Sequence, residues 1–127
     1  MADLASYAST PATAMVQIST ANTNRDGTGT LGTLVTAPAT GIRVDDILIC
    51  AAGSTTAGVV RMFVSDGTNH RLIREILVPL ITPSATVEVW STTLRNLAFI
   101  LTNGWSLRFS THNAETFNIF FSRGGVI

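Results

Sequence analysis

Apolar and polar residues alternate with a period of two along most of the 127-residue chain, the pattern of half-buried β-strands rather than of helices. Turn-forming pairs such as Asp66-Gly67 and Asn103-Gly104 separate the alternating segments. About eight or nine short strands at this spacing predict an all-β fold, an antiparallel β-sandwich or barrel. The predicted strands lie at residues 16–19, 31–36, 44–51, 58–65, 71–78, 86–92, 97–101, 105–110 and 117–121.

The chain divides into an N-terminal arm, residues 1–14, and a single sandwich domain, residues 15–127. The arm is small and polar, and Leu4 and Tyr7 are its isolated apolar anchors. Such a segment is expected to lie extended on a neighbouring molecule or to be disordered on its own. We therefore take Leu4 and Tyr7 as candidate interface residues.

One hairpin can be predicted in detail, because the strands 58–65 and 71–78 flank Asp66-Gly67. A four-residue loop, 66–69, would place Arg61 opposite Arg74, whereas a three-residue loop, 67–69, would place Arg61 opposite Glu75. Opposite charges stabilise a cross-strand pair by about 0.2–1 kcal/mol and like charges destabilise it. The Arg61–Glu75 pairing is therefore expected. The run RLIREIL is the one candidate helix, and the hairpin argues against it.

The charge composition points away from several partner classes. Only 13% of residues are charged, every basic residue is arginine, and the net charge is zero. This composition gives no reason to expect nucleic-acid binding, and no apolar run or basic leader indicates a membrane span or a secretory signal. A surface so poor in charge is expected to be covered by other subunits, where arginine is favoured over lysine. The single cysteine, Cys50, is expected to be buried and inert.

The stretch NTNRDGTGTLGT, residues 22–33, matches two ligand-binding templates. Its glycines are spaced G-x-G-x-x-G, but the residues that follow favour a strand, and a phosphate-binding loop requires a helix there. Asn22, Asn24 and Asp26 stand at the first three ligand positions of a calcium loop, but Thr33 replaces the closing glutamate. These three residues are a weak calcium candidate, and the favoured interpretation is a polar turn with Arg25 as an interface contact.

The remaining polar residues give no catalytic constellation. His70 and His112 stand beside turns and are expected to form local hydrogen bonds, and they are not spaced with Cys50 as zinc ligands. Asp45 and Asp46 are adjacent on a strand, so their side chains are expected to point to opposite faces, one in a salt bridge and one solvated. We therefore expect no enzyme activity, no catalytic residues, no metal and no cofactor.

The two tryptophans differ in their phase along the strands. Trp105 is in phase with Leu107 and Phe109 and is expected in the core. Trp90 is out of phase with Val87 and Val89, so it is the better candidate for an exposed contact to a glycan or to another subunit.

The phrases QISTANTNRDGTGT, TTAGVVRMFVSDGTNHRLIREI, TPSATV and NGWSLRFSTHNAETFNIF together resemble a family of small structural proteins encoded among the virion genes of tailed phages. The resemblance covers about residues 17–121 and marks no catalytic residue. It implies a virion component, and above all a capsid decoration (cement) protein. Small cement proteins of this kind are often jelly-roll sandwiches.

This resemblance sets the expected partners. They are the major capsid protein and further copies of the chain itself, as a dimer or trimer, on a capsid surface assembled in the host cytoplasm. The N-terminal arm and the tail IFFSRGGVI, which includes Arg123, are expected to clamp between capsid subunits. The alternative is a tail, fibre or neck module that binds a host glycan through Trp90.

Overall fold

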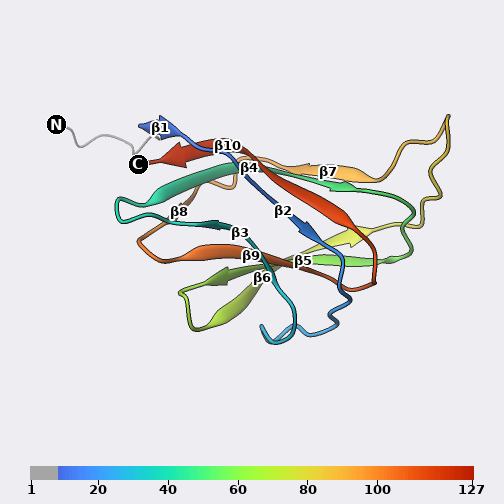
Figure 1. The fold of residues 1–127 in the computed structure, drawn as a ribbon, viewed down its shortest axis with the longest axis horizontal. Helices are drawn as coiled ribbons and strands as arrows, with labels where there is room; N and C mark the ends of the chain where they lie inside the picture. The colour runs from blue at the N-terminus through green and yellow to red at the C-terminus, as the bar shows by residue number, and fades with distance from the viewer. Residues whose placement is uncertain (1–8) are drawn as a thin grey trace.

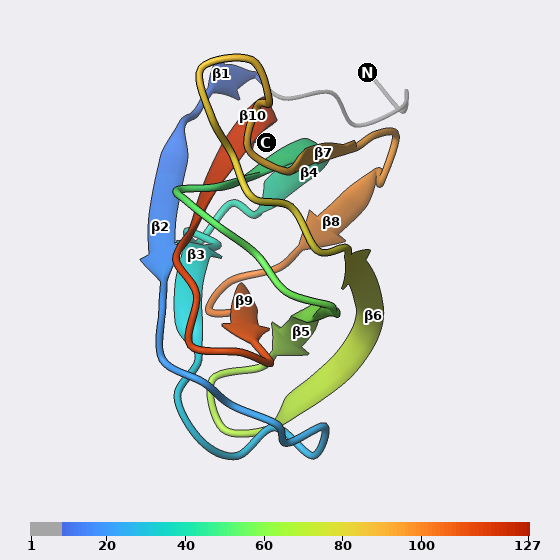
Figure 2. The ribbon, with the colours of Figure 1, turned by 90° about the vertical axis from the view of Figure 1, so that its right-hand side faces the viewer.

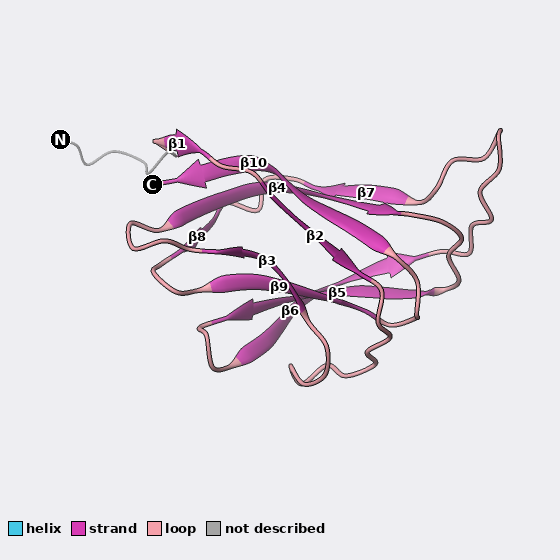
Figure 3. Ribbon diagram, viewed as in Figure 1, coloured by secondary structure: helices cyan, strands magenta, loops and turns pink. Residues whose placement is uncertain are grey.

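The computed structural model describes residues 9–127, so the predicted anchors Leu4 and Tyr7 lie outside the described residues. Within that range every regular element is a strand (Figure 3). The strands are β1 (Thr10–Pro11), β2 (Ala14–Ile18), β3 (Gly32–Thr36), β4 (Ile42–Ala51), β5 (Gly58–Ser65), β6 (His70–Val78), β7 (Ser91–Leu94), β8 (Phe99–Leu101), β9 (Ser106–Thr111) and β10 (Phe117–Val126).

The strands form two antiparallel sheets that pack face to face (Figures 1 and 2). In the six-stranded sheet, β10 and β4 are central, β1 and β2 both flank β10, and β7 and β8 both flank β4. The four-stranded sheet has the order β3-β9-β5-β6. The predicted all-β antiparallel sandwich is therefore confirmed.

The strands pair in a nested order along the chain. β2 pairs with β10, β3 with β9, β4 with β7 and β8, and β5 with β6. Chain segments near the two ends of the sequence therefore lie side by side, and most contacts that hold the fold are long-range. The tail that is expected to clamp between capsid subunits lies almost wholly within β10, at the centre of the six-stranded sheet, and its contact with other subunits stays a prediction.

The core lies between the sheets, and along most strands its residues alternate with outward-facing ones. On β4 this alternation changes phase between Val44 and Ile47, where the register with β10 shifts. The fully buried apolar members include Val44, Ile47 and Ile49 of β4, Val60 and Met62 of β5, Leu107 and Phe109 of β9, and Phe117, Ile119 and Phe121 of β10.

Two predicted segments differ from the structure. The predicted strand 86–92 shrinks to β7, because residues 84–87 form a tight turn closed by the bridge between Ser84 and Val87. Val87 is 46% exposed, so its alternation with polar neighbours does not reflect a buried face. Part of the predicted arm belongs to the domain, because Thr10 and Pro11 pair with the end of β10.

The β5–β6 hairpin combines both predicted registers. Its tip is the four-residue loop Asp66–Asn69, which pairs Ser65 with His70 and would by itself place Arg61 opposite Arg74. A register shift between Met62 and Phe63 leaves Ile73 without a partner, and beyond it Arg61 pairs with Glu75. The expected charge pair is therefore present, but a β-bulge creates it rather than a three-residue loop.

Candidate functional site

An arginine is buried at the centre of the four-stranded sheet, on the face that points away from the core. Arg61 is 1% exposed and lies between Val60 and Met62, which point into the sandwich. It therefore shares the outer face of β5 with Phe63, which is fully buried. A buried guanidinium is tolerated only where its charge and its N–H groups have partners.

Partners from three separate parts of the chain surround this guanidinium. Its Nε donates to Glu75 Oε2 on β6 at 2.8 Å, and its Nη1 donates to the backbone carbonyl of Asn22 at 3.1 Å. Its Nη2 lies 3.1 Å from Nδ1 of His112, in the turn after β9. Because arginine can only donate, His112 must accept at Nδ1, and its remaining proton is on Nε2.

A second arginine shares the same carboxylate. Nε of Arg25 donates to Glu75 Oε2 at 2.7 Å, and the Arg25 side chain is 65% exposed. The pKa of Glu75 is lowered below its ordinary value, most strongly by the hydrogen bond from Arg25 and next by the one from Arg61. The same contact raises the pKa of Arg25. Two guanidinium groups therefore surround one carboxylate, and the cluster carries a net positive charge.

The segment that carries Arg25 is the crossing loop, residues 19–31, which joins β2 to β3 over the outer face of the four-stranded sheet (Figure 1). It is fixed to β9 by the hydrogen bond from Asn22 N to the Thr111 carbonyl, and to β6 by Arg25 and by the contact of Gly27 with His70. It therefore spans β9, β5 and β6, and its Asn22 carbonyl accepts the hydrogen bond from Arg61 on β5.

Asn22 organises the crossing loop from inside. Its side chain is buried, and Nδ2 donates to the carbonyls of Thr28 and Thr30, each at 3.0 Å. Its Oδ1 accepts from the backbone N–H of Asn24 at 3.0 Å. Asp26 Oδ1 in turn accepts from the N–H and the hydroxyl of Thr28. The loop is thus held by its own side chains, as an Asx-type turn is.

These contacts bear on the two ligand-binding interpretations of NTNRDGTGTLGT. The Oδ1 atoms of Asn22 and Asp26 already accept local hydrogen bonds, which favours the polar turn over the weak calcium candidate Asn22, Asn24 and Asp26. Gly27 and Gly29 have positive φ, and the strand β3 follows them instead of a helix. The phosphate-binding template therefore lacks the element that it needs.

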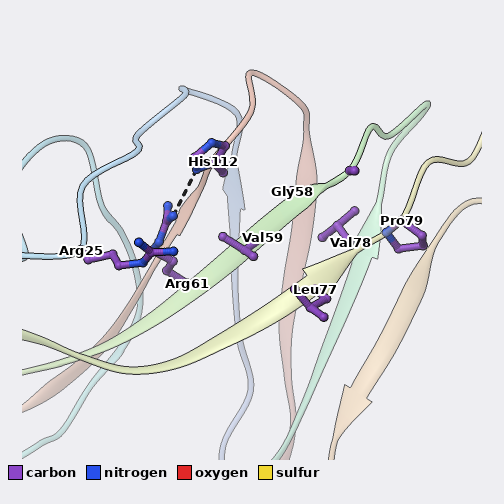
Figure 4. A pocket seen from close by; sticks show the side chains of 9 residues that line it. Arg25, Gly58, Val59, Arg61, Leu77, Val78, Pro79 and His112 are labelled. Carbon is purple, nitrogen blue, oxygen red and sulfur yellow. Dashed lines mark hydrogen bonds between the residues drawn. The ribbon is translucent and has the colours of Figure 1, made fainter.

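Beside the arginines, the outer face forms a trough of about 570 Å3 at the beginning of β5 and the end of β6. Figure 4 shows Arg25 and Arg61 at one end of it, with His112 above them and apolar side chains along its length. Its lining consists of Arg25, Ala57, Gly58, Val59, Arg61, Leu77, Val78, Pro79 and His112. Leu77 is 77% exposed. The trough can accommodate an apolar group whose anionic end meets the arginines.

The exposure of the two tryptophans is the reverse of what their phase along the strands predicts. Trp90 is half-buried, and its ring packs edge-on against Phe117 with the ring centroids 5.8 Å apart. Trp105 is 40% exposed, because Thr102–Trp105 form a turn in which the N–H of Trp105 bonds to the Thr102 carbonyl. The strand β9 begins only at Ser106, so the alternation that placed Trp105 in the core did not yet apply.

Other predicted residues lie apart from the trough. Arg123, on β10, is 3.7 Å from Asp46 and largely exposed. Asp45 pairs with Arg43 at 2.9 Å, so both aspartates have an arginine partner and neither is merely solvated.

Cys50 and His112 also depart from their predictions, whereas His70 follows its own. Cys50 is half-buried rather than fully buried. His70 bonds locally to Ser65 at 2.8 Å, as expected, but His112 contacts Arg61, which is distant in sequence.

Sequence reasoning missed Arg61 as the centre of a cluster. The available signal was its position in VVRMFVS, where residues of both phases are apolar, so that either face of the strand could be covered. The covering segment is not recognisable from the sequence, because the crossing loop carries no apolar pattern.

No family model matches the chain, and no curated protein matches it. The described residues contain no group of three or more His, Cys, Asp or Glu side chains that could hold a metal ion. They also contain no helix long and apolar enough to cross a membrane.

Proposed function

We propose that this protein is a structural component of a tailed-phage virion, a decoration protein that binds the outer capsid and stabilises the shell. The proposal rests first on the nested strand pairing. The nested pairing of β2 with β10, β3 with β9, β4 with β7 and β8, and β5 with β6 supports a jelly-roll arrangement, an architecture common in viral capsid domains.

The single observation that carries the proposal is an uncharged outer face on the six-stranded sheet. Two neighbouring rows of side chains cross β2, β10, β4 and β7 in register, and neither row contains a charge. We call these residues the uncharged face: Met15, Phe120, Leu48 and Thr93 in one row, and Gln17, Asn118, Cys50 and Ser91 in the other.

The exposure of this face supports a docking role. Met15 is 82% exposed and Phe120 is 40% exposed, while their inward neighbours on β10 are completely buried. A sheet face without charges that leaves large apolar side chains in contact with water is typical of an interaction surface. Repeated over many copies on a lattice, even a modest contact of this kind adds up to substantial stabilisation of the shell.

The test uses particles assembled with and without this protein. We expect removal to lower the temperature at which the shell releases its DNA, and we expect the protein in numbers proportional to the major shell protein. A few copies per particle, or an unchanged release temperature, would contradict the proposal.

A matched pair of variants locates the surface. Phe120→Lys introduces a charge into the uncharged face, whereas Thr68→Lys introduces the same charge into the exposed tip of the β5–β6 hairpin. We expect Phe120→Lys to abolish rebinding to stripped particles, and Thr68→Lys to rebind like the wild type. Equal rebinding by both variants would exclude the uncharged face as the docking surface.

A further inference from the structure

The trough beside Arg25 and Arg61 lies on the sheet opposite to the uncharged face. Its length is apolar, formed by Val59, Leu77 and Pro79, and the end at Arg25 and Arg61 is cationic (Figure 4). A side chain as exposed as Leu77, 77%, gains from being covered. The occupant must therefore bring an apolar side chain into the trough.

The cationic end defines the rest of the occupant. All three nitrogens of Arg61 are engaged, but Arg25 uses only Nε within the described residues, so its two terminal nitrogens remain able to donate. Terminal nitrogens of arginine bind carboxylates in a bidentate manner. The occupant that fits is a carboxylate adjacent in sequence to an apolar side chain.

The chain itself contains such a pair outside the described residues. Residues 1–8 read MADLASYA, and Asp3, their only acidic residue, directly precedes Leu4. The described chain begins at Ser9, whose N–H bonds to the Val126 carbonyl at the end of β10. The charge and the apolar residue that the trough requires are therefore both present in this segment.

The segment cannot fill the trough of its own molecule. Ser9 lies at the Val126 end of β10, whereas the trough lies beside Gly58 and His112, near the Phe117 end (Figure 1). The ten residues of β10 span about 33 Å. The chain from Ser9 back to Leu4 reaches at most about 18 Å. If this segment fills the trough, it has to come from a second copy.

We propose that residues 1–8 of one copy bind the trough of a neighbouring copy, with Asp3 opposite Arg25 and Leu4 on Val59 and Leu77. The arm leaves one end of the sandwich and the trough lies near the other, so the contact is head-to-tail. Such a contact generates a closed ring or an open chain of copies. The inference concerns contacts between copies only, and it can hold or fail whether or not the assembly coats a capsid.

The test is the molar mass of the full-length protein in solution, measured by light scattering over a range of concentrations. We expect the wild type to associate beyond the monomer. Asp3→Arg and Arg25→Asp should each raise the dissociation constant by at least about tenfold, because like charges then face each other. The double variant Asp3→Arg/Arg25→Asp should regain most of the affinity.

Two controls separate this contact from a general effect of charge or of folding. Arg95→Asp makes the same charge change at an exposed arginine away from the trough and should leave the association unchanged. A thermal melt by circular dichroism should show that Asp3→Arg unfolds like the wild type. Exposed Ile100 provides the apolar control, since Leu77→Ser should weaken association and Ile100→Ser should not.

A synthetic peptide of residues 1–9 gives an independent readout. Added to the full-length protein, it should compete for the trough, lower the molar mass and shift the amide signals of Val59 and Leu77. A peptide with Leu4→Ser should do neither. A monomeric wild type at every concentration, an unchanged mass in both single charge variants, or no recovery in the double variant would overturn the proposal.

Discussion

Replacing Asn22 by alanine tests whether the crossing loop is held from inside by one side chain. The change removes the two hydrogen bonds from Nδ2 to the Thr28 and Thr30 carbonyls and the one from the Asn24 N–H to Oδ1. A hydrogen bond contributes about 0.5–1.5 kcal/mol net, so three of them correspond to about 2–4 kcal/mol. Because a domain is stable by only about 5–15 kcal/mol, this loss is large.

The matched control lies two residues away. Asn24 is exposed, and its side chain makes one hydrogen bond, to the Thr28 hydroxyl at 3.0 Å. Asn24→Ala should therefore cost less than about 1 kcal/mol. A third variant, Asn22→Asp, keeps the acceptor for the Asn24 N–H but places a carboxylate oxygen against two carbonyls. At neutral pH it should be at least as unstable as Asn22→Ala.

The assay is urea unfolding followed by the fluorescence of Trp90 and Trp105. We expect a lower midpoint for Asn22→Ala with an unchanged slope, which would mean that stability changed and the unfolded state did not. If Asn22→Ala and Asn24→Ala unfold at the same urea concentration, the inside of the loop does not depend on Asn22 and the reasoning is wrong.

Three further predictions concern the crossing loop and the outer face of the four-stranded sheet beneath it. The pKa of Glu75 is lowered in the folded state, so its contribution to stability is present at neutral pH and is lost as the pH falls below the ordinary value of 4.5. Glu75→Gln should therefore be less stable than the wild type at pH 7. In thermal melts it should lose less stability than the wild type as the pH is lowered below 4.5. Gly27→Ala should destabilise more than Gly67→Ala in the urea assay, because both have positive φ but only at Gly27 would a Cβ collide with the His70 carbonyl. Calcium at micromolar concentration should leave the melting temperature unchanged, whereas a rise would restore the calcium interpretation of Asn22, Asn24 and Asp26.

The local patterns of this sequence predict the elements well where a strand is half-buried. β5 has the predicted bounds, and β3, β4, β6 and β9 differ by a few residues, because alternation reports burial on one face directly. The same rule fails at Trp105 and at Val87, which stand in turns rather than in strands. Side chains in a turn do not alternate between the two faces of a sheet, so the phase of these two residues did not indicate whether they are buried.

The β5–β6 hairpin shows how far pairwise reasoning extends. Charge complementarity correctly predicts Arg61 opposite Glu75, because the energy of a cross-strand pair depends mainly on the two residues that face each other. The predicted three-residue loop is wrong. Asp66 accepts hydrogen bonds from the N–H groups of Thr68 and Asn69, and this favours the four-residue turn. The bulge at Ile73 reconciles the two preferences, and neither preference alone predicts it.

The sequence by itself determined the all-β class, the approximate strand positions and the polar, glycine-bent character of residues 22–33. The tertiary structure decided what that stretch does. Only the nested pairing of distant strands brings the crossing loop over β5, where it buries Arg61 and gathers Arg25, Glu75 and His112 at one end of a trough. Periodicity is a property of neighbours in sequence. The hydrogen bonds of this cluster join residues up to 51 positions apart, so no local pattern could predict it.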